Sequence, residues 1–345
     1  MLRRLALALG ALALFVAPLP ARADDSLTVM SGAGAPGIFD MIDLVAAGAG
    51  FLKEQHLNVN KQYVAGPGTA AQLVAAGKAD IASISVEPVI LGYEKGLRLQ
   101  FFFARGARYS YVLGVLNDSP IKSLSDFKGA VLGQTAANTS DVAAKSMLGG
   151  VGLRPGDYSF VSIGIGAGAL ASVVAKRVDG VADPFLEIAN AEANGVHFRV
   201  FRHPTLSDVV NTGYAAAPAT IQSKSEVLKR FSRAMAEASL FVRVNPGAAA
   251  KLYLQGSGQA VTDESLARIT RLVTFDKGDF PAANPLSKTI GLMAPRKVQL
   301  LSSYMSDYGV ISAPVPGNVI ATDQFIAYAN DFDHKAVEKL AKNWR

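Results

Sequence analysis

Residues 57–84 read LNVNKQYVAGPGTAAQLVAAGKADIASI and contain the unit that decides the fold. Residues 57–64 predict a strand, and the turn at 66–69 (Gly-Pro-Gly-Thr) opens a helix that runs through Ala76. Asp80 then precedes a short apolar run at 81–84, which predicts a second strand. The unit is therefore a strand, a tight turn, a helix and a further strand.

The same unit occurs again about 100 residues later, where residues 160–183 read FVSIGIGAGALASVVAKRVDGVAD. A strand at 160–163, a glycine-rich turn at 164–168 and a helix through Lys176 repeat the order. Asp179 takes the place of Asp80, and Pro184 takes the place of Pro88. Strands that alternate with helices predict mostly parallel sheets covered on both faces. Two such units predict two α/β lobes.

Ligands of open α/β sheets lie beyond the carboxyl ends of the strands. Two lobes that face each other would therefore bind a ligand in one cleft between them. The turns at 66–69 and 164–168 lie there, and each leaves free backbone N–H groups at a helix N-terminus. Both also match G-x-G-x-x-A, which is typical of dinucleotide binding. A motif present in both repeats is better explained by a turn that both lobes need. We therefore expect no nucleotide cofactor.

The N-terminus predicts a secretory signal peptide. Arg3 and Arg4 precede an unbroken apolar run at 5–17, and residues 21–23 read Ala-Arg-Ala, an A-x-A cleavage site. The run is shorter than the roughly 20 residues needed to cross a bilayer. We expect cleavage after Ala23 and a mature chain of 322 residues in the periplasm.

Composition excludes several function classes. The sequence contains no cysteine, which excludes disulfides, thiol catalysis and a lipid-anchored N-terminus. The mature chain has 31 basic and 28 acidic residues, which is too even a balance for nucleic-acid binding. The four histidines lack metal-ligand spacing, and no hydrolase, zinc-protease or P-loop motif occurs. We expect that the protein binds no metal and is not an enzyme.

The last third predicts helices without further strands. Residues 224–244 carry apolar residues at helical spacing, and Asn245-Pro246 predicts a capped restart. Further helices are expected from Thr262 and over 296–308, with Gly309 as a stop. We expect this segment, including Trp344, to pack against the first lobe.

The sequence resembles the sulfonate, nitrate and thiamine-precursor class of periplasmic binding proteins. The resemblance is carried by short stretches in a specific order: GKADI at 77–81, IKSLSDFKG at 121–129, Gly152-Leu153, VDG at 178–180 with Asp183-Pro184, and DYGVI at 307–311. It implies the two-lobed type II fold, with lobe one formed by 27–113 plus 213–345 and lobe two by 114–212. The lobes would close about two crossing strands near Val115 and Gly213.

The expected ligand site gathers residues from the turns and strand ends of both lobes. These candidates are Ser31, Phe39, Gly68, Thr69, Ser85, Glu87, Thr135, Asn138, Thr139, Ser140, Gly166, Asp183 and Tyr214. Several of them have a structural alternative. Asn138, Thr139 or Ser140 would also cap a helix that starts at Asp141. Asp183 would also cap a helix whose first residue is Pro184.

The expected function is that of a receptor that hands a small molecule to an ABC permease in the inner membrane. We expect a monomer, and the sequence leaves open a sulfonate, a nitrate-like anion, a pyrimidine or a carboxylate as ligand. Two alternatives are a sensory module for a membrane receptor and an enzyme on this scaffold, for which Asp183 and Glu187 would be the titratable pair. A permease or a histidine kinase encoded beside the gene would separate transport from sensing.

Overall fold

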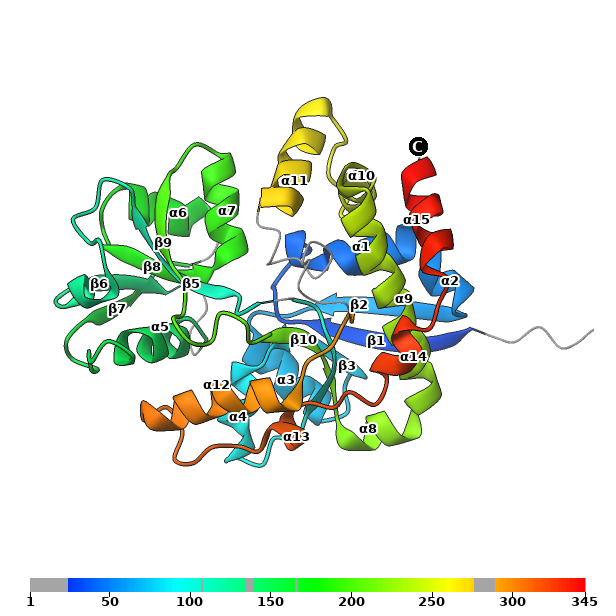
Figure 1. Ribbon diagram of the computed structural model, residues 1–345, viewed down its shortest axis with the longest axis horizontal. Helices are drawn as coiled ribbons and strands as arrows, with labels where there is room; N and C mark the ends of the chain where they lie inside the picture. Colours follow the sequence, from blue (N-terminus) through cyan, green and yellow to red (C-terminus); the bar gives the residue numbers. More distant parts are fainter. Residues whose placement is uncertain (1–23, 107, 135–138, 165–166, 276–288, 345) are drawn as a thin grey trace, which may run out of the picture.

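The computed structural model describes residues 24–106, 108–134, 139–164, 167–275 and 289–344. Its strands form two five-stranded sheets that lie side by side with helices packed around them (Figure 1). We call each sheet, together with the helices packed on it, a lobe. The predicted two-lobed α/β architecture is confirmed, whereas the predicted signal peptide lies outside the described residues.

The sheet of lobe one has the strand order β2-β1-β3-β10-β4. β1 pairs in parallel with β2 and β3, and β10 is antiparallel to both of its neighbours. The strands are β1 (Asp25–Ser31), β2 (Leu57–Tyr63), β3 (Ile81–Ser85), β4 (Gln100–Ala104) and β10 (Thr212–Ala216).

The sheet of lobe two has the order β7-β6-β8-β5-β9, which repeats that of lobe one. β6 is parallel to β7 and β8, and β5 is antiparallel to β8 and β9. The strands are β5 (Tyr111–Leu116), β6 (Val131–Gln134), β7 (Ser159–Ser162), β8 (Gly180–Pro184) and β9 (Phe198–Phe201). In each lobe the antiparallel strand is the one that follows a crossing from the other lobe.

Two aspartates make the same contacts in the two lobes. The Asp80 carboxylate accepts a hydrogen bond from Thr28 N at 2.9 Å, and the Asp179 carboxylate accepts one from Val131 N at 2.8 Å. Each aspartate also donates its own N–H to the carbonyl of the same partner residue. Each aspartate therefore ties one parallel strand, β1 or β6, to the residue directly before the next, β3 or β8, which confirms their predicted equivalence.

The crossings differ in position from the expectation. β5 pairs along its length with β8 and β9, so Val115 lies inside the sheet of lobe two, opposite Arg199. The chain instead leaves lobe one between Ala104 and Tyr111, and it returns between Phe201 and Thr212. The cause is the apolar run of β5, which is buried as an inner strand with a neighbour on each side.

The helices of lobe one cover both faces of its sheet, and the C-terminal third supplies most of them (Figure 1). The last helix packs on the longest one, where the Trp344 ring lies 5.4 Å from that of Phe241. The helices of lobe one are η1 (Ile38–Asp40), α1 (Met41–Gly48), α2 (Phe51–Glu54), α3 (Pro67–Ala75), α4 (Glu87–Tyr93), α8 (Pro218–Ser223), α9 (Ser225–Val244), α10 (Pro246–Gly256), α11 (Asp263–Phe275), α12 (Pro295–Asp307), α13 (Gly317–Ile320), α14 (Ile326–Asn330) and α15 (His334–Asn343).

Lobe two carries fewer helices: η2 (Leu124–Phe127), α5 (Thr139–Gly149), α6 (Ala167–Val174) and α7 (Phe185–Ala193). The helix α11 reaches across from lobe one and contacts α7. Among the described residues, no helix combines the length and apolar character that crossing a membrane requires.

Candidate functional site

A cleft of about 670 Å³ is lined by residues of both lobes. Lobe one contributes the segments that follow β1, β2, β3 and β4, and lobe two contributes Tyr111, Asp183, Pro184 and Glu187. These segments follow the carboxyl ends of parallel strands, where α/β proteins bind ligands. The size lies within the roughly 300–1,000 Å³ typical of sites for small organic molecules.

The lobe-one wall is rich in hydrogen-bond donors. Helix α3 begins there, and Pro67 has no N–H, so the N–H groups of Gly68 and Thr69 come first in the helix and lack intrahelical acceptors. Ser83 and Ser85 lie at the end of β3 and are only 3% and 6% exposed. The Ser83 hydroxyl has no hydrogen-bond partner among the described residues, whereas the Ser85 hydroxyl lies beside the Glu87 carboxyl. Such a wall suits a ligand group that accepts hydrogen bonds.

The two loops of this wall hold each other in place. Gly66 N donates to Gly32 O at 3.1 Å, and Val64 N donates to the carbonyl of Ser31 at 2.9 Å. Gly66 has a φ of +88°, a conformation that favours glycine, and it sits where the chain turns from β2 into α3. A Cβ on Gly32 would lie 2.5 Å from the Cα of Pro67. The close approach of the two loops therefore requires glycine at position 32.

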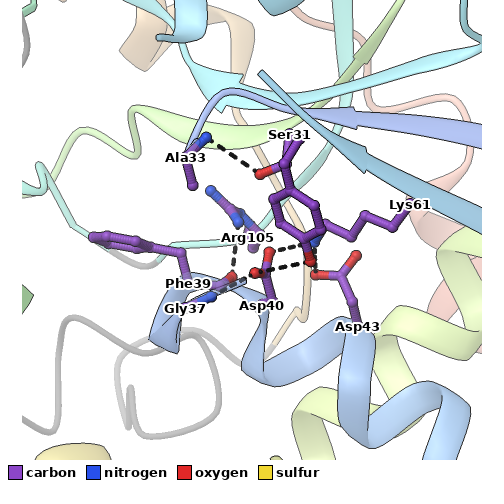
Figure 2. A network of polar contacts seen from close by, with 9 residues as sticks. Ser31, Ala33, Gly37, Phe39, Asp40, Asp43, Lys61 and Arg105 are labelled. Atoms are coloured by element: carbon purple, nitrogen blue, oxygen red, sulfur yellow. Dashed lines mark hydrogen bonds and ion pairs between the residues drawn. The ribbon is translucent and has the colours of Figure 1, made fainter. Parts of the chain in front are cut away.

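The cleft loop that carries Phe39 is anchored from behind by a buried polar network (Figure 2). Asp40 accepts hydrogen bonds from Gly37 N at 2.9 Å and from the Tyr63 hydroxyl at 3.2 Å. Burial and the nearby Asp40 carboxylate raise the pKa of Tyr63, so its hydroxyl keeps the proton that it donates. These contacts fix the turn that presents the Phe39 ring and backbone to the cleft.

A single lysine pairs with two carboxylates in this network. Lys61 Nζ lies 2.5 Å from Asp40 Oδ1 and 2.8 Å from Asp43 Oδ2, and the three side chains are 12%, 0% and 9% exposed. The lysine comes from β2, whereas the aspartates come from η1 and α1. The network therefore joins the sheet to the cleft loop through charges that depend on one another.

Arg105 is a cleft residue that sequence reasoning missed. Its Nη1 donates to the carbonyl of Phe39 at 2.7 Å, and the residue lines the cleft (Figure 2). It directly follows β4, which ends at the same edge of the sheet as β3, since both are antiparallel to β10. The sequence did contain a signal for this residue, because a basic residue stands directly after an apolar strand.

The lobe-two wall is acidic. Asp183 is the last residue but one of β8, Glu187 lies in the first turn of α7, and Tyr111 belongs to the neighbouring strand β5. Burial raises the pKa of Glu187 above its usual range. The expected cap is wrong: Asp183 pairs with Val112 inside the sheet, and the helix begins only at Phe185, so the strand continues through the Asp-Pro pair. Asp183 is thereby placed on the cleft.

Glu87 lies in the fold beside the crossings, outside the residues that line the cleft. Asn211 Nδ2 donates to its carboxyl at 2.8 Å, and Asn211 Oδ1 accepts from Ser110 N at 2.9 Å. Val86 N also donates to the Asn211 carbonyl. Asn211 thus links both crossing segments to the start of α4. Burial raises the pKa of Glu87, while the Asn211 hydrogen bond opposes that rise.

A buried histidine occupies the second crossing segment. His203 Nδ1 accepts hydrogen bonds from Thr205 N and Leu206 N, so its Nε2–H donates to Ser146 Oγ at 2.9 Å. Ser146 belongs to α5 of lobe two, and the imidazole packs edge-on against Tyr304 of α12 in lobe one. Burial lowers the pKa of His203 to about 4, so the ring is neutral at pH 7.

The remaining candidates separate into two groups. Tyr214, Thr139 and Ser140 are fully buried and do not line the cleft. Tyr214 points into the core of lobe one, where its ring lies 5.0 Å from that of Phe231, while the cleft side of the same strand end is taken by Thr212. Thr135, Asn138 and Gly166 lie outside the described residues.

Comparisons with known proteins agree with this architecture. A protein of Bordetella bronchiseptica RB50 is similar with a TM-score of 0.70 at 21% identity, over 89% of this chain and 97% of the other. The periplasmic aliphatic sulphonate binding protein SsuA of Escherichia coli is similar with a TM-score of 0.66 at 16% identity, over 86% and 92%. The periplasmic nitrate-binding protein NrtA of Synechocystis PCC 6803 is similar with a TM-score of 0.66 at 11% identity, over 94% and 100%. At these identities the likeness shows the fold alone.

No curated protein matches the sequence. A family model does match, over residues 41–249, which is more than half of the chain. The matched segment covers most of both sheets and most of the segments that line the cleft. The chain therefore belongs to the NMT1/THI5-like family.

Proposed function

We propose that this chain is the periplasmic solute-binding receptor of an ABC importer and captures a small organic molecule or anion between its lobes. The observation that carries the proposal is the cleft itself, whose polar residues come from both lobes. A ligand that contacts both walls favours the closed arrangement, since binding can drive closure only through contacts that the closed state makes.

Two further observations support the proposal. The chain crosses between the lobes only twice among the described residues, and both crossings run past Asn211, which suits a hinge. Two similar structures, those of SsuA and NrtA, are periplasmic binding proteins for sulphonate and nitrate. The predicted signal peptide at 1–23 would deliver the chain to the same compartment.

A thermal-shift screen of residues 24–345 tests the proposal. The compounds are sulfonates, pyrimidines, flavins, carboxylates and inorganic anions. A ligand at 100 times its Kd adds about 2.7 kcal/mol of stability, which raises the Tm by several degrees. A hit that Ser85→Ala weakens supports the cleft as the binding site. If no compound raises the Tm and native mass spectrometry finds no bound molecule in the purified protein, the receptor function is refuted.

A further inference from the structure

The charged residues of the cleft are divided between its walls. Among the described lining residues, lobe one supplies one charged side chain, Arg105, and lobe two supplies two, Asp183 and Glu187. The division follows from the fold, because Arg105 leaves β4 of the first sheet while the carboxylates lie where β8 of the second sheet passes into α7. The two walls thus have opposite polarity.

The lobe-one wall offers donors to an acceptor group. Among the described residues the buried Ser83 hydroxyl has no partner, and the N–H groups of Gly68 and Thr69 lie in the first turn of α3. Arg105 has five N–H donors, of which one bond, to Phe39 O, is formed with the described chain. Behind this wall, Lys61 supplies one positive charge to the two carboxylates of Asp40 and Asp43. Arg105 therefore keeps N–H donors for a ligand, while its charge acts in the same surroundings as Asp40 and Asp43.

The lobe-two wall favours a ligand group that donates hydrogen bonds or carries a positive charge. The described residues offer the Glu187 carboxylate no hydrogen bond and no ion pair, and burial is what shifts its pKa upward. Asp183 is 7% exposed and lines the same part of the cleft. The Glu187 carboxylate becomes costly to bury further on closure unless an N–H donor or a cation meets it. A purely anionic ligand would bring a further negative charge to the surroundings of Glu187.

We infer that the ligand is bipolar: a hydrogen-bond-accepting or anionic group contacts Arg105 and the lobe-one donors, and an amine or other N–H-bearing cationic group contacts Glu187 and Asp183. The inference rests on the proposed function, since it assigns the ligand class of that same cleft. The volume of about 670 Å³ leaves room for a carbon skeleton between the two groups. Each lobe then recognises one end, so a molecule with both ends gains the most from closure.

Two matched sets of probes test the inference by calorimetric titration of residues 24–345. One set is 6-aminohexanoate, hexanoate and hexylamine, and the other is 4-(aminomethyl)benzoate, 4-methylbenzoate and 4-methylbenzylamine. In at least one set, the bipolar compound should bind at least tenfold more tightly than either single-ended compound. Glu187→Gln should remove that advantage and leave the affinity for the acid unchanged. Glu338→Gln on α15, far from the cleft lining, is the matched control and should change nothing.

The inference is overturned if an acid binds as tightly as its bipolar counterpart, or if Glu187→Gln leaves the advantage intact. The receptor function survives either result, because a ligand still binds in the cleft. Absence of binding by all six probes also overturns the inference. The proposed function fails only when the thermal-shift screen and native mass spectrometry are blank as well, so the two failures are distinguishable.

Discussion

Replacing Lys61 by methionine should destabilise lobe one more than the same substitution at an exposed lysine. Lys61 Nζ is the cation shared by Asp40 and Asp43, at 2.5 and 2.8 Å, and both carboxylates are almost fully buried. Methionine keeps most of the side-chain length and removes the charge, which leaves two buried carboxylates together. Removing one partner of a buried ion pair costs about 3–5 kcal/mol, and we expect a loss of that size here.

Urea unfolding measures this loss directly. The single tryptophan, Trp344, packs against Phe241 in lobe one, so its fluorescence reports the unfolding of that lobe. Lys342→Met is the control, because Lys342 is 66% exposed and pairs with Glu338 at 3.8 Å. An exposed pair of this kind contributes less than about 1 kcal/mol.

A second variant separates charge from packing. Lys61→Met combined with Asp43→Leu removes one carboxylate together with the lysine and leaves Asp40 its hydrogen bonds from Gly37 and Tyr63. We expect the double variant to regain at least about 1 kcal/mol, since contacting residues couple by roughly 0.5–3 kcal/mol. The reasoning is refuted if Lys61→Met costs no more than Lys342→Met, or if the second substitution adds to the loss.

Other substitutions test the cleft and the crossings. Ser83→Ala should leave the ligand-free protein as stable in urea, or slightly more stable, because it removes a buried hydroxyl that has no partner among the described residues. The same substitution should weaken ligand binding. A loss of stability would contradict this expectation. Gly32→Ala should lower the Tm, since its Cβ would meet the Pro67 backbone at 2.5 Å, whereas Gly68→Ala, with open space at its Cβ, should not; equal effects would disprove the close approach. His203 should make stability fall as the pH drops from about 6.5 to about 4, because the unfolded chain binds a proton that the folded chain excludes. The shift corresponds to about 3 kcal/mol, and His203→Asn should flatten that part of the urea-midpoint profile; an unchanged profile would contradict the assignment.

The lobes were predictable from the sequence because each repeat carries its own local signals. The turn at 66–69, the aspartates at 80 and 179 and the proline-initiated helices are short-range patterns. The structure places Asp80 and Asp179 in matching hydrogen bonds, as the repeat predicts. The lobe-one half of the candidate site followed from the same logic, since strand ends and the turn before α3 line the cleft.

The parts that were missed depend on contacts between distant segments. Lys61 meets Asp40 and Asp43 only because β2 pairs with β1 and α1 packs nearby, and no motif in the sequence joins these positions. Glu87 and Asp183 both precede a proline, yet one is buried beside Asn211 and the other lies on the cleft. The positions at which the chain crosses between the lobes decide which of these two residues lies on the cleft. Local sequence patterns do not contain that information.

Ligand-dependent closure of the two lobes is the most direct test of the account. The sequence has no cysteine, so Lys128→Cys in lobe two and Lys335→Cys on α15 of lobe one give a clean pair of spin-label sites, both exposed. Double electron–electron resonance then measures the distance between the labels with and without the ligand found by the thermal-shift screen. We expect the distance distribution to shift with added ligand until saturation, and to need more ligand in the Ser85→Ala background. A distribution that stays the same at saturating ligand would contradict a receptor that works by lobe closure.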